Sequence, residues 1–209
     1  LDLRIMKYVA NRADKWNANL RKINLPGIME EFDRSIHKEI DYTNEFMNMQ
    51  RIEMNFIENP NIHIPATYDK YCTSKVLTME FIDGAKLNDV YESKGDEYDK
   101  KFIAKNVIDS YLQQLFIDGF FHGDPHPGNI MILEDNVLCY LDLGMMGFFD
   151  EKFKRELSEV MLLFVDQDVD GLINQLMYMD ILDYDIDTST LRRDMNDLFG
   201  RYFGVQLNR

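Results

Sequence analysis

The sequence lacks any apolar run of about 18 residues, the length at which a segment reads as a membrane-spanning helix, and it shows no secretory signal pattern. We therefore expect no membrane-spanning helix among these residues. Cysteine is also scarce, and Cys72 and Cys139 lack the spacing of a metal site. Because Cys139 lies within a short apolar run, we expect it to be a buried, reduced thiol, which is typical of a reducing compartment.

Basic residues are few: 23 Lys and Arg stand against 37 Asp and Glu, giving a formal net charge of −14 at pH 7. This argues against a nucleic-acid partner, because binding a phosphate backbone requires a basic surface. With 45% hydrophobic residues, the 209 residues can bury a core as one domain or as one domain of two lobes. The chain starts at Leu1 without a Met and reaches Arg209 without a recognisable end, so we expect it to be part of a longer protein.

Two short motifs contain the candidate catalytic and metal-binding residues. Residues 122–129 read HGDPHPGN and residues 142–144 read DLG. Asn129 follows Asp124 by five residues and Asp142 follows it by eighteen, which is the spacing of a phosphotransferase catalytic loop and its metal-binding partner. Asp124 would then orient or deprotonate a nucleophile.

The residues between these motifs predict a β-hairpin. Two apolar runs, 130–133 and 137–141, are joined by the turn-prone segment 134–136. Because a hairpin returns the chain to its starting point, Asn129 and Asp142 should lie close together. Mg²⁺ bound to a nucleotide takes one or two carboxylates together with phosphate oxygens and water. We therefore predict that these two residues hold Mg²⁺.

Two other interpretations of the loop stay open. Each Asp or His could be an ordinary cap or solvated loop residue, although the motif spacing satisfies several constraints at once. Alternatively, His122, Asp124 and His126 could form a metal cluster, since alternate residues of an extended segment share a face. Pro125 and Pro127 disfavour the regular strand that such a cluster needs.

Apolar periodicity predicts a mostly helical chain with a few strands. Helices are expected at residues 3–22, 28–58 and 102–121 and from residue 150 onward, and strands at 62–68 and 75–81. Taken alone, the acidic residues Glu39, Asp41 and Glu45 read as a solvated helix face. In the last helical region eight residues are expected in the core: Met161, Leu162, Phe164, Val165, Leu172, Ile173, Leu176 and Met177.

The order of these elements resembles that of a protein kinase from its αC helix onward. Residues 39–45, EIDYTNE, are similar to the E-x-D motif and the αC glutamate of the UbiB/ADCK atypical kinases. The 122–129 loop is very similar to that of the family's bacterial members. Residues 78–84, TMEFIDG, resemble the last N-lobe strand and the hinge. The resemblance covers nearly all of residues 1–150.

This resemblance implies an α+β, protein kinase-like fold that uses ATP and Mg²⁺. Residues 1–81 would form a partial N-lobe and residues 82–209 a mostly helical C-lobe. Asp124 matches the catalytic Asp, and Asn129 and Asp142 match the Mg²⁺ ligands.

The resemblance also gives the acidic helix residues a function. Glu45 matches the αC glutamate that pairs with a strand lysine, and Glu39 and Asp41 match a motif that contacts an N-terminal extension folded over the active site. Residues two or six positions apart on an ideal helix point in different directions, so the three cannot line one site on a straight helix. We therefore predict a break or bend between about Ile36 and Thr43, with Glu45 inside a regular helix.

The resemblance extends to the hinge, but several motifs of the family are missing from these residues. Glu80 and Ile82 fall where backbone groups would bond adenine, with Met79 behind the base. These residues contain no glycine- or alanine-rich nucleotide loop, no V-A-I-K-like lysine and no K-x-G-Q motif. We therefore expect a truncated N-lobe and little ATP turnover by this chain alone. No A-P-E segment follows Asp142, which argues against a protein substrate.

The function implied is that of an ATP-using atypical kinase or ATPase that supports isoprenoid-quinone (ubiquinone-like) biosynthesis. Its partners would be the nucleotide and, through parts outside this chain, a lipid or quinone precursor and a membrane surface on the cytoplasmic side. A small-molecule phosphotransferase of the aminoglycoside or choline kinase type is the alternative, because it shares the His-Gly-Asp-x-x-x-x-Asn loop. The Glu39-x-Asp41 pair favours the first. A pseudokinase scaffold is a third class, against which the intact Asp124, Asn129 and Asp142 argue.

Overall fold

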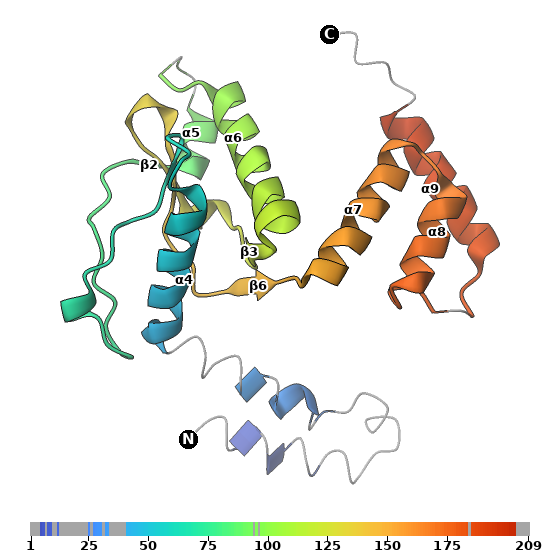
Figure 1. Cartoon of the computed structure of the whole chain (residues 1–209), viewed down its shortest axis with the longest axis horizontal. Helices are drawn as coiled ribbons and strands as arrows, with labels where there is room; N and C mark the ends of the chain where they lie inside the picture. Colours follow the sequence, from blue (N-terminus) through green and yellow to red (C-terminus); the bar gives the residue numbers. More distant parts are fainter. Residues whose placement is uncertain are drawn as a thin grey trace. The chain divides into compact units, whose positions relative to one another are not determined.

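The chain has an α+β structure, mostly helical with a small mixed sheet, as expected. The computed structural model describes residues 5–6, 8–9, 12, 25, 27–30, 32–33, 41–93, 95, 97–183 and 185–203 (Figure 1). Two compact units make up the chain: Leu1–Ser110 with His122–Met146, and Tyr111–Phe121 with Gly147–Arg209. The predicted lobe boundary between residues 81 and 82 falls inside the first unit, and the division into lobes stays a prediction.

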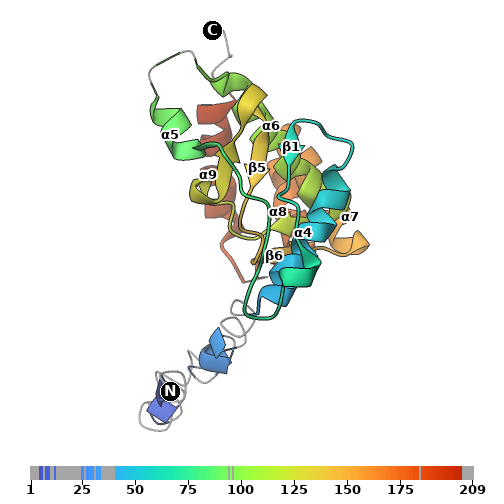
Figure 2. The same cartoon turned by 90° about the vertical axis from the view of Figure 1, so that its left-hand side faces the viewer.

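A four-stranded sheet forms the centre of the first unit. Its strands stand in the order β1 (Ile62–His63), β5 (Leu138–Tyr140), β4 (Ile130–Ile132) and β2 (Ala85–Lys86). Strand β1 runs parallel to β5, whereas β4 is antiparallel to both of its neighbours. All of β5 is buried, and helix α4 (Tyr42–Phe56) lies against β1 (Figure 2). The residues at both ends of the segment that joins β4 to β5, Ile132 and Leu138, are therefore buried.

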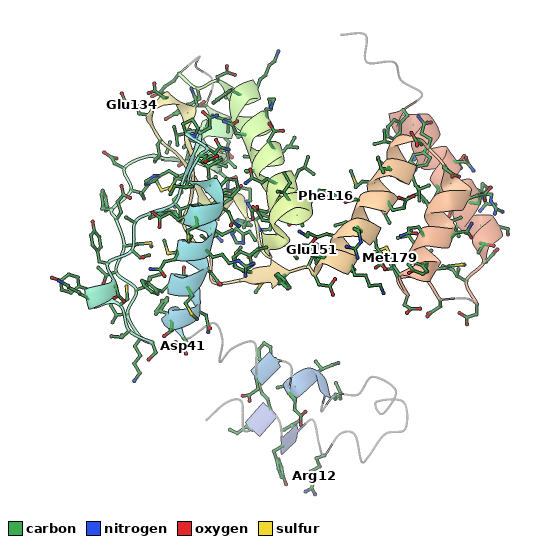
Figure 3. All side chains as sticks on the ribbon, viewed as in Figure 1. Arg12, Asp41, Phe116, Glu134, Glu151 and Met179 are labelled. Carbon is green, nitrogen blue, oxygen red and sulfur yellow. The ribbon has the colours of Figure 1, made fainter. Side chains whose placement is uncertain are left out.

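The predicted hairpin is confirmed, with strands one or two residues shorter than expected. Ile130 pairs with Tyr140 at its open end. The turn uses two left-handed residues, Asp135 at φ 59° and Asn136 at φ 60°, a conformation that Asp and Asn tolerate better than most residues. Glu134 marks the tip (Figure 3). The local turn chemistry and the apolar runs thus agree on the same register.

The strands expected at 62–68 and 75–81 are present only in part. Regular strand covers just the two residues of β1, because Pro65 lacks the N–H that a paired strand requires. Beyond Pro65 the two segments run side by side and meet in one isolated antiparallel bridge, between Thr67 and Met79 (Figure 1).

Helix α4 begins at Tyr42, and Asp41 is its N-cap. The backbone of Asp41 is extended, and its Oδ1 accepts a hydrogen bond from the Thr43 N–H at 3.1 Å. The predicted break ahead of Glu45 is therefore confirmed, and Glu45 lies inside regular helix. The expected continuous helix over 28–58 is wrong, because an Asp at this point stabilises a helix start.

The residues ahead of α4 are described only in part. Of the first expected helix, residues 5–6, 8–9 and 12 are helical, and the rest lies outside the described residues. Gly27, which lies between the helices expected at 3–22 and 28–58, is helical.

Helix α6 (Lys100–Leu112) leads towards the HGD loop. It continues into a π-helical turn, η2 (Gln113–Asp118), and Gly119 then takes a left-handed φ of 59° before strand β3 (Phe120–His122) begins. The helix expected over 102–121 is therefore wrong for its last residues, where left-handed Gly119 ends the helix. The other short elements are η1 (Asp69–Tyr71), α5 (Leu87–Glu92), η3 (Pro127–Asn129), η4 (Glu134–Asn136) and β6 (Met146–Phe148), which pairs with β3.

The buried face of α6 is partly polar. Ile103 is buried, and Asn106 and Ser110 are buried with it, whereas Ile108 is 58% exposed. The reason is a polar contact: the Ser110 Oγ lies 2.7 Å from the hydroxyl of buried Tyr140, and the two share a hydrogen bond. Satisfying that hydroxyl turns a partly polar stripe of α6 inward.

After β6, the described residues of the second unit form α7 (Glu151–Val165), α8 (Val169–Tyr178) and α9 (Thr188–Tyr202). Each begins at an aspartate whose side chain accepts a hydrogen bond from the first turn. Their core consists of Val169, Leu172, Ile173 and Phe199.

The predicted core of this unit is right in part. Leu172 and Ile173 are buried, but Met161, Leu162 and Val165 are exposed. Phe164 and Met177 pack against the core as expected, and α7 also contributes Val160 and Leu163, which were not predicted. Residues 161–165, MLLFV, are all apolar, so the sequence pattern does not indicate which face of α7 packs against the core.

Both cysteines are free thiols. Cys139 in β5 is fully buried, and burial raises the pKa of its thiol to about 12, so the expected buried, reduced thiol is confirmed. Cys72 is half-buried, and its Sγ lies 3.4 Å from both the backbone N–H and the carbonyl oxygen of Thr78.

Candidate active site

The HGD loop is held by backbone hydrogen bonds at both ends. The Gly123 N–H donates to the Met145 carbonyl at 2.8 Å, which ties the loop to the residues after the DLG motif. Farther on, the His126 N–H donates to the Asp124 carbonyl at 2.7 Å and the Asn129 N–H to the His126 carbonyl at 2.9 Å. These bonds coil the loop tightly, so that Asp124 and Asn129 stay near each other.

The hairpin then brings the second motif to the same place. The Leu141 N–H donates to the Asn129 carbonyl at 2.9 Å, one residue beyond the last register pair of β4 and β5. Asp142 follows directly. Its Oδ1 accepts from the Gly144 N–H at 3.0 Å, while its Oδ2 has no hydrogen bond from a described residue. One carboxylate oxygen is therefore held by the backbone, and among the described residues no donor engages the other.

A cavity of about 190 Å³ lies where these segments meet. It is lined by Tyr42, Glu45, His122, Asp124, Asn129, Asp142, Gly144 and Met145. The structure thus gathers Glu45, Asp124, Asn129 and Asp142, all predicted site residues, around one space together with His122.

A second cavity, of about 510 Å³, shares three of these lining residues. It is lined by Tyr42, Glu45, Lys75, Val76, Leu77, Met79, Leu141 and Asp142. The smaller cavity is lined mainly by side chains that carry oxygen. Half of the residues that line the larger cavity are apolar, namely Val76, Leu77, Met79 and Leu141. This division suits a ligand with a charged part and a flat apolar part.

The metal cluster of His122, Asp124 and His126 is not formed. Among the described residues, no three His, Cys, Asp or Glu side chains are placed to hold a metal ion. The Nδ1 of His122 accepts from the Asp124 N–H, and the Nδ1 of His126 accepts from the Gly128 N–H at 3.0 Å. Asn129 and Asp142 therefore remain the oxygen donors that fit Mg²⁺, with phosphate oxygens and water to complete its shell.

Glu45 reaches the site from α4. Burial raises the pKa of its carboxyl group, and the neighbouring Asp142 carboxylate raises it further, while a hydrogen bond from the Leu143 backbone lowers it. On the same helix, the Asn48 Nδ2 donates to the Leu143 carbonyl at 2.8 Å. The helix and the DLG motif are thus joined directly, and two carboxylates are held close enough to favour a cation.

His122 lies beneath the loop with only 1% of its surface exposed. Burial lowers the pKa of its imidazole, although a hydrogen bond with the Met145 backbone and the charges of Asp142 and Asp124 oppose the shift. The side chain is therefore neutral at pH 7 and supports the loop without adding charge.

A sequence-family comparison agrees with this arrangement. The model of the ABC1 atypical kinase-like domain matches residues 1–176. The chain belongs to the ABC1 atypical kinase-like family. The resemblance to the UbiB/ADCK kinases is thereby confirmed.

Several proteins are similar to this chain along most of its length. An uncharacterized protein in the hydrogenase 1 5′ region of Clostridium pasteurianum is 33% identical over 86% of the chain and 34% of its own length. Protein Activity of BC1 Complex Kinase 7, chloroplastic, from Arabidopsis thaliana is 32% identical over 93% of the chain and 28% of its own length. The chain spans about a third of the length of these relatives.

A solved structure supports the fold alone. Rv3197 of Mycobacterium tuberculosis, in its complex with erythromycin, superposes with a TM-score of 0.72 at 21% identity, over 97% of this chain and 50% of that one. Among the described residues of this ABC1 domain, no helix is both long and apolar enough to cross a membrane.

Other predicted site residues lie elsewhere. Glu80 and Ile82 do not line either cavity. The Glu80 Oε2 lies 2.9 Å from the Nε2 of His63, with which it shares a hydrogen bond, and it accepts another from the Ala66 N–H at 3.1 Å. These bonds engage the Glu80 side chain, and the Glu80 N–H donates to the Ala66 carbonyl at 2.8 Å, so the Glu80 carbonyl oxygen is the group left for a ligand. Met79 does line the larger cavity.

Of the two acidic residues ahead of Glu45, only Asp41 is among the described residues. Asp41 uses its carboxylate as the cap of α4 and does not line either cavity. Glu39 lies outside the described residues. Their predicted contact with an N-terminal extension stays a prediction.

The sequence analysis missed some residues of the site. Asn48 was detectable, because it lies three residues after Glu45 and so shares its helix face. Tyr42, Leu77 and Lys75 gave no such signal. They reach the site only because the turn before Val76 folds against the start of α4.

Proposed function

We propose that the protein is an atypical kinase or ATPase that uses Mg²⁺ and ATP. One observation carries the proposal: Asp124, Asn129 and Asp142 line one cavity, and this cavity shares residues with a larger, partly apolar one. The polyphosphate would occupy the smaller space and the nucleoside the larger. Membership of the ABC1 family supports nucleotide use.

Each residue of the smaller cavity has one role in this proposal. Asn129 and Asp142 hold the Mg²⁺ ion, which when bound neutralises charge on the phosphate oxygens. Asp124 accepts the proton of the attacking hydroxyl group or water as the new P–O bond forms and ADP departs. Neutral His122 supports the loop that carries Asp124.

The rest of the proposal follows the family resemblance. In a kinase-like arrangement, residues 1–81 supply part of an N-lobe and residues 82–209 a C-lobe. The backbone groups of Glu80 and Ile82 hold adenine, with Met79 behind the base. We extend the proposal to a role of the full-length protein in isoprenoid-quinone biosynthesis, at a membrane surface on the cytoplasmic side.

Exchanging the proposed base for its amide tests the function. In the full-length protein, Asp124→Asn should lower the rate of ATP turnover at least about a hundredfold, because it removes the proton acceptor. The affinity for Mg-ATP, measured by calorimetry, should stay close to that of the wild type, since this interaction is made mostly in the transition state. Asp135→Asn, in the hairpin turn, is the matched control. Turnover by Asp124→Asn at the wild-type rate would refute the catalytic role.

A further inference from the structure

The two cavities are acidic, which is a poor environment for a polyphosphate. Glu45, Asp124 and Asp142 contribute carboxylates, and His122 is neutral because its pKa is lowered by burial. Among the described residues that line either space, Lys75 is the only cationic side chain. Among these described lining residues, Lys75 is therefore the one side chain that could offset phosphate charge beside a metal ion.

The position of Lys75 is fixed by its backbone. It lies in a tight turn closed by two hydrogen bonds, from the Thr73 N–H to the Val76 carbonyl at 2.7 Å and from the Val76 N–H to the Thr73 carbonyl at 3.3 Å. The Lys75 N–H itself donates to the Thr73 Oγ1 at 3.2 Å. The turn is therefore rigid without any contact through the Lys75 side chain.

A further bond attaches this turn to the site. The Tyr42 N–H, at the first residue of α4, donates to the Ser74 carbonyl at 3.2 Å. Glu45 follows Tyr42 within the same helical turn, so the bond sets Lys75 against the helix that carries Glu45. Among the described residues, no salt bridge engages the Lys75 ammonium group.

We propose that Lys75 is a phosphate-binding residue, whose ammonium group extends from the larger cavity to the polyphosphate of ATP where the two cavities share Tyr42, Glu45 and Asp142. This inference rests on the proposed nucleotide site and adds a residue that the sequence motifs do not include. A lysine suits the role, because its compact charge and three N–H donors bind phosphate as a point charge. Its four-carbon stem can lie along apolar lining residues such as Val76 and Leu77 and leave the charged end for the phosphate.

Calorimetric titration of the full-length protein with Mg-ATP and, separately, with adenosine tests the inference. Lys75→Met should weaken Mg-ATP binding about tenfold, because it removes a charge-assisted hydrogen bond, and should leave adenosine binding unchanged. Lys75→Arg keeps the charge and should bind Mg-ATP nearly as well as the wild type. Lys70→Met is the matched control, since Lys70 lies on the same segment and lines neither cavity. Thermal melting of each variant checks that the fold is intact.

The outcomes separate this inference from the function on which it rests. Unchanged Mg-ATP affinity in Lys75→Met, or an equal loss for ATP and adenosine, overturns the role of Lys75. If Asp142→Asn still weakens Mg-ATP binding in that case, the nucleotide site stands and only Lys75 is wrong. If the wild type binds no Mg-ATP, both proposals fail.

Discussion

His122 shows how one buried side chain supports the catalytic loop. Its Nδ1 accepts from the Asp124 N–H, so the imidazole must remain neutral to keep this hydrogen bond. A buried imidazole that charges in acid loses both the bond and its favourable environment. The hydrogen bond from the Asp124 N–H to His122 is therefore expected at neutral pH and should be lost in acid.

This gives a prediction for stability against pH. The pKa of His122 is lowered in the folded protein from an ordinary value of 6.5, chiefly by burial. Its contribution to the free energy of unfolding is therefore fully present above pH 6.5 and is lost as the pH falls through the lowered pKa. In metal-free protein, the stability of His122→Gln should depend less on pH below 6.5 than that of the wild type.

Chemical denaturation at a series of pH values measures this difference. His126→Gln is the control, because His126 lies exposed in the same loop. The explanation fails if wild type and His122→Gln lose stability in parallel as the solution is acidified.

At the scale of an element, α4 links the site to the rest of the first unit. Its N-cap fixes where the helix begins, and Glu45 and Asn48, on one face, reach the DLG motif. A shift of the helix start would move both side chains. The capping bond of Asp41 therefore has a consequence for the site as well as for stability.

Asp41 can be tested by two substitutions. Asp41→Ala should lower the free energy of unfolding by about 1 kcal/mol, because it removes the side-chain cap, and should lower the melting temperature by about 2–4 °C. Asp41→Asn keeps the cap and should melt close to the wild type. Differential scanning calorimetry compares them. Equal melting of Asp41→Ala and the wild type would show that the cap contributes nothing.

The same pair separates capping from the role that the family resemblance implies for Asp41. If Asp41→Asn melts normally yet loses ATP turnover in the full-length protein, the charge itself acts at the site. If turnover follows stability, Asp41 acts through the helix alone.

Elements with strong local signals could be predicted from the sequence. The hairpin is one, because Asp135 and Asn136 accept the left-handed turn and the flanking runs are apolar. The start of α4 is another, where Asp41 is a good cap. The end of the helix before β3 was missed, because Phe120 and Phe121 continue the apolar pattern and only Gly119 marks the change.

Contacts between distant segments could not be predicted. The bond from Tyr42 to Ser74 joins positions 32 residues apart, and neither residue carries a motif. The buried polar pair of Ser110 and Tyr140 likewise depends on how α6 meets β5. Spacing along the chain gives the chemistry of the loop, whereas such contacts decide what surrounds it.

For the whole molecule, the net charge of −14 sets the conditions for binding. ATP is itself an anion, and the candidate site adds carboxylates to the overall field. Repulsion of this kind weakens with salt and is offset locally by a bound cation. Binding of ATP should therefore depend on Mg²⁺, and that dependence should reside in Asn129 and Asp142.

Calorimetric titration of the full-length protein with ATP, in the presence and absence of Mg²⁺, tests this central claim most directly. Asp142→Asn should weaken binding of Mg-ATP by more than about tenfold. The control Asp135→Asn, which removes a carboxylate from the hairpin turn, should bind as the wild type does. Without Mg²⁺ the three proteins should bind ATP with a similar, low affinity. Equal Mg-ATP affinities for Asp142→Asn and the wild type would contradict the account.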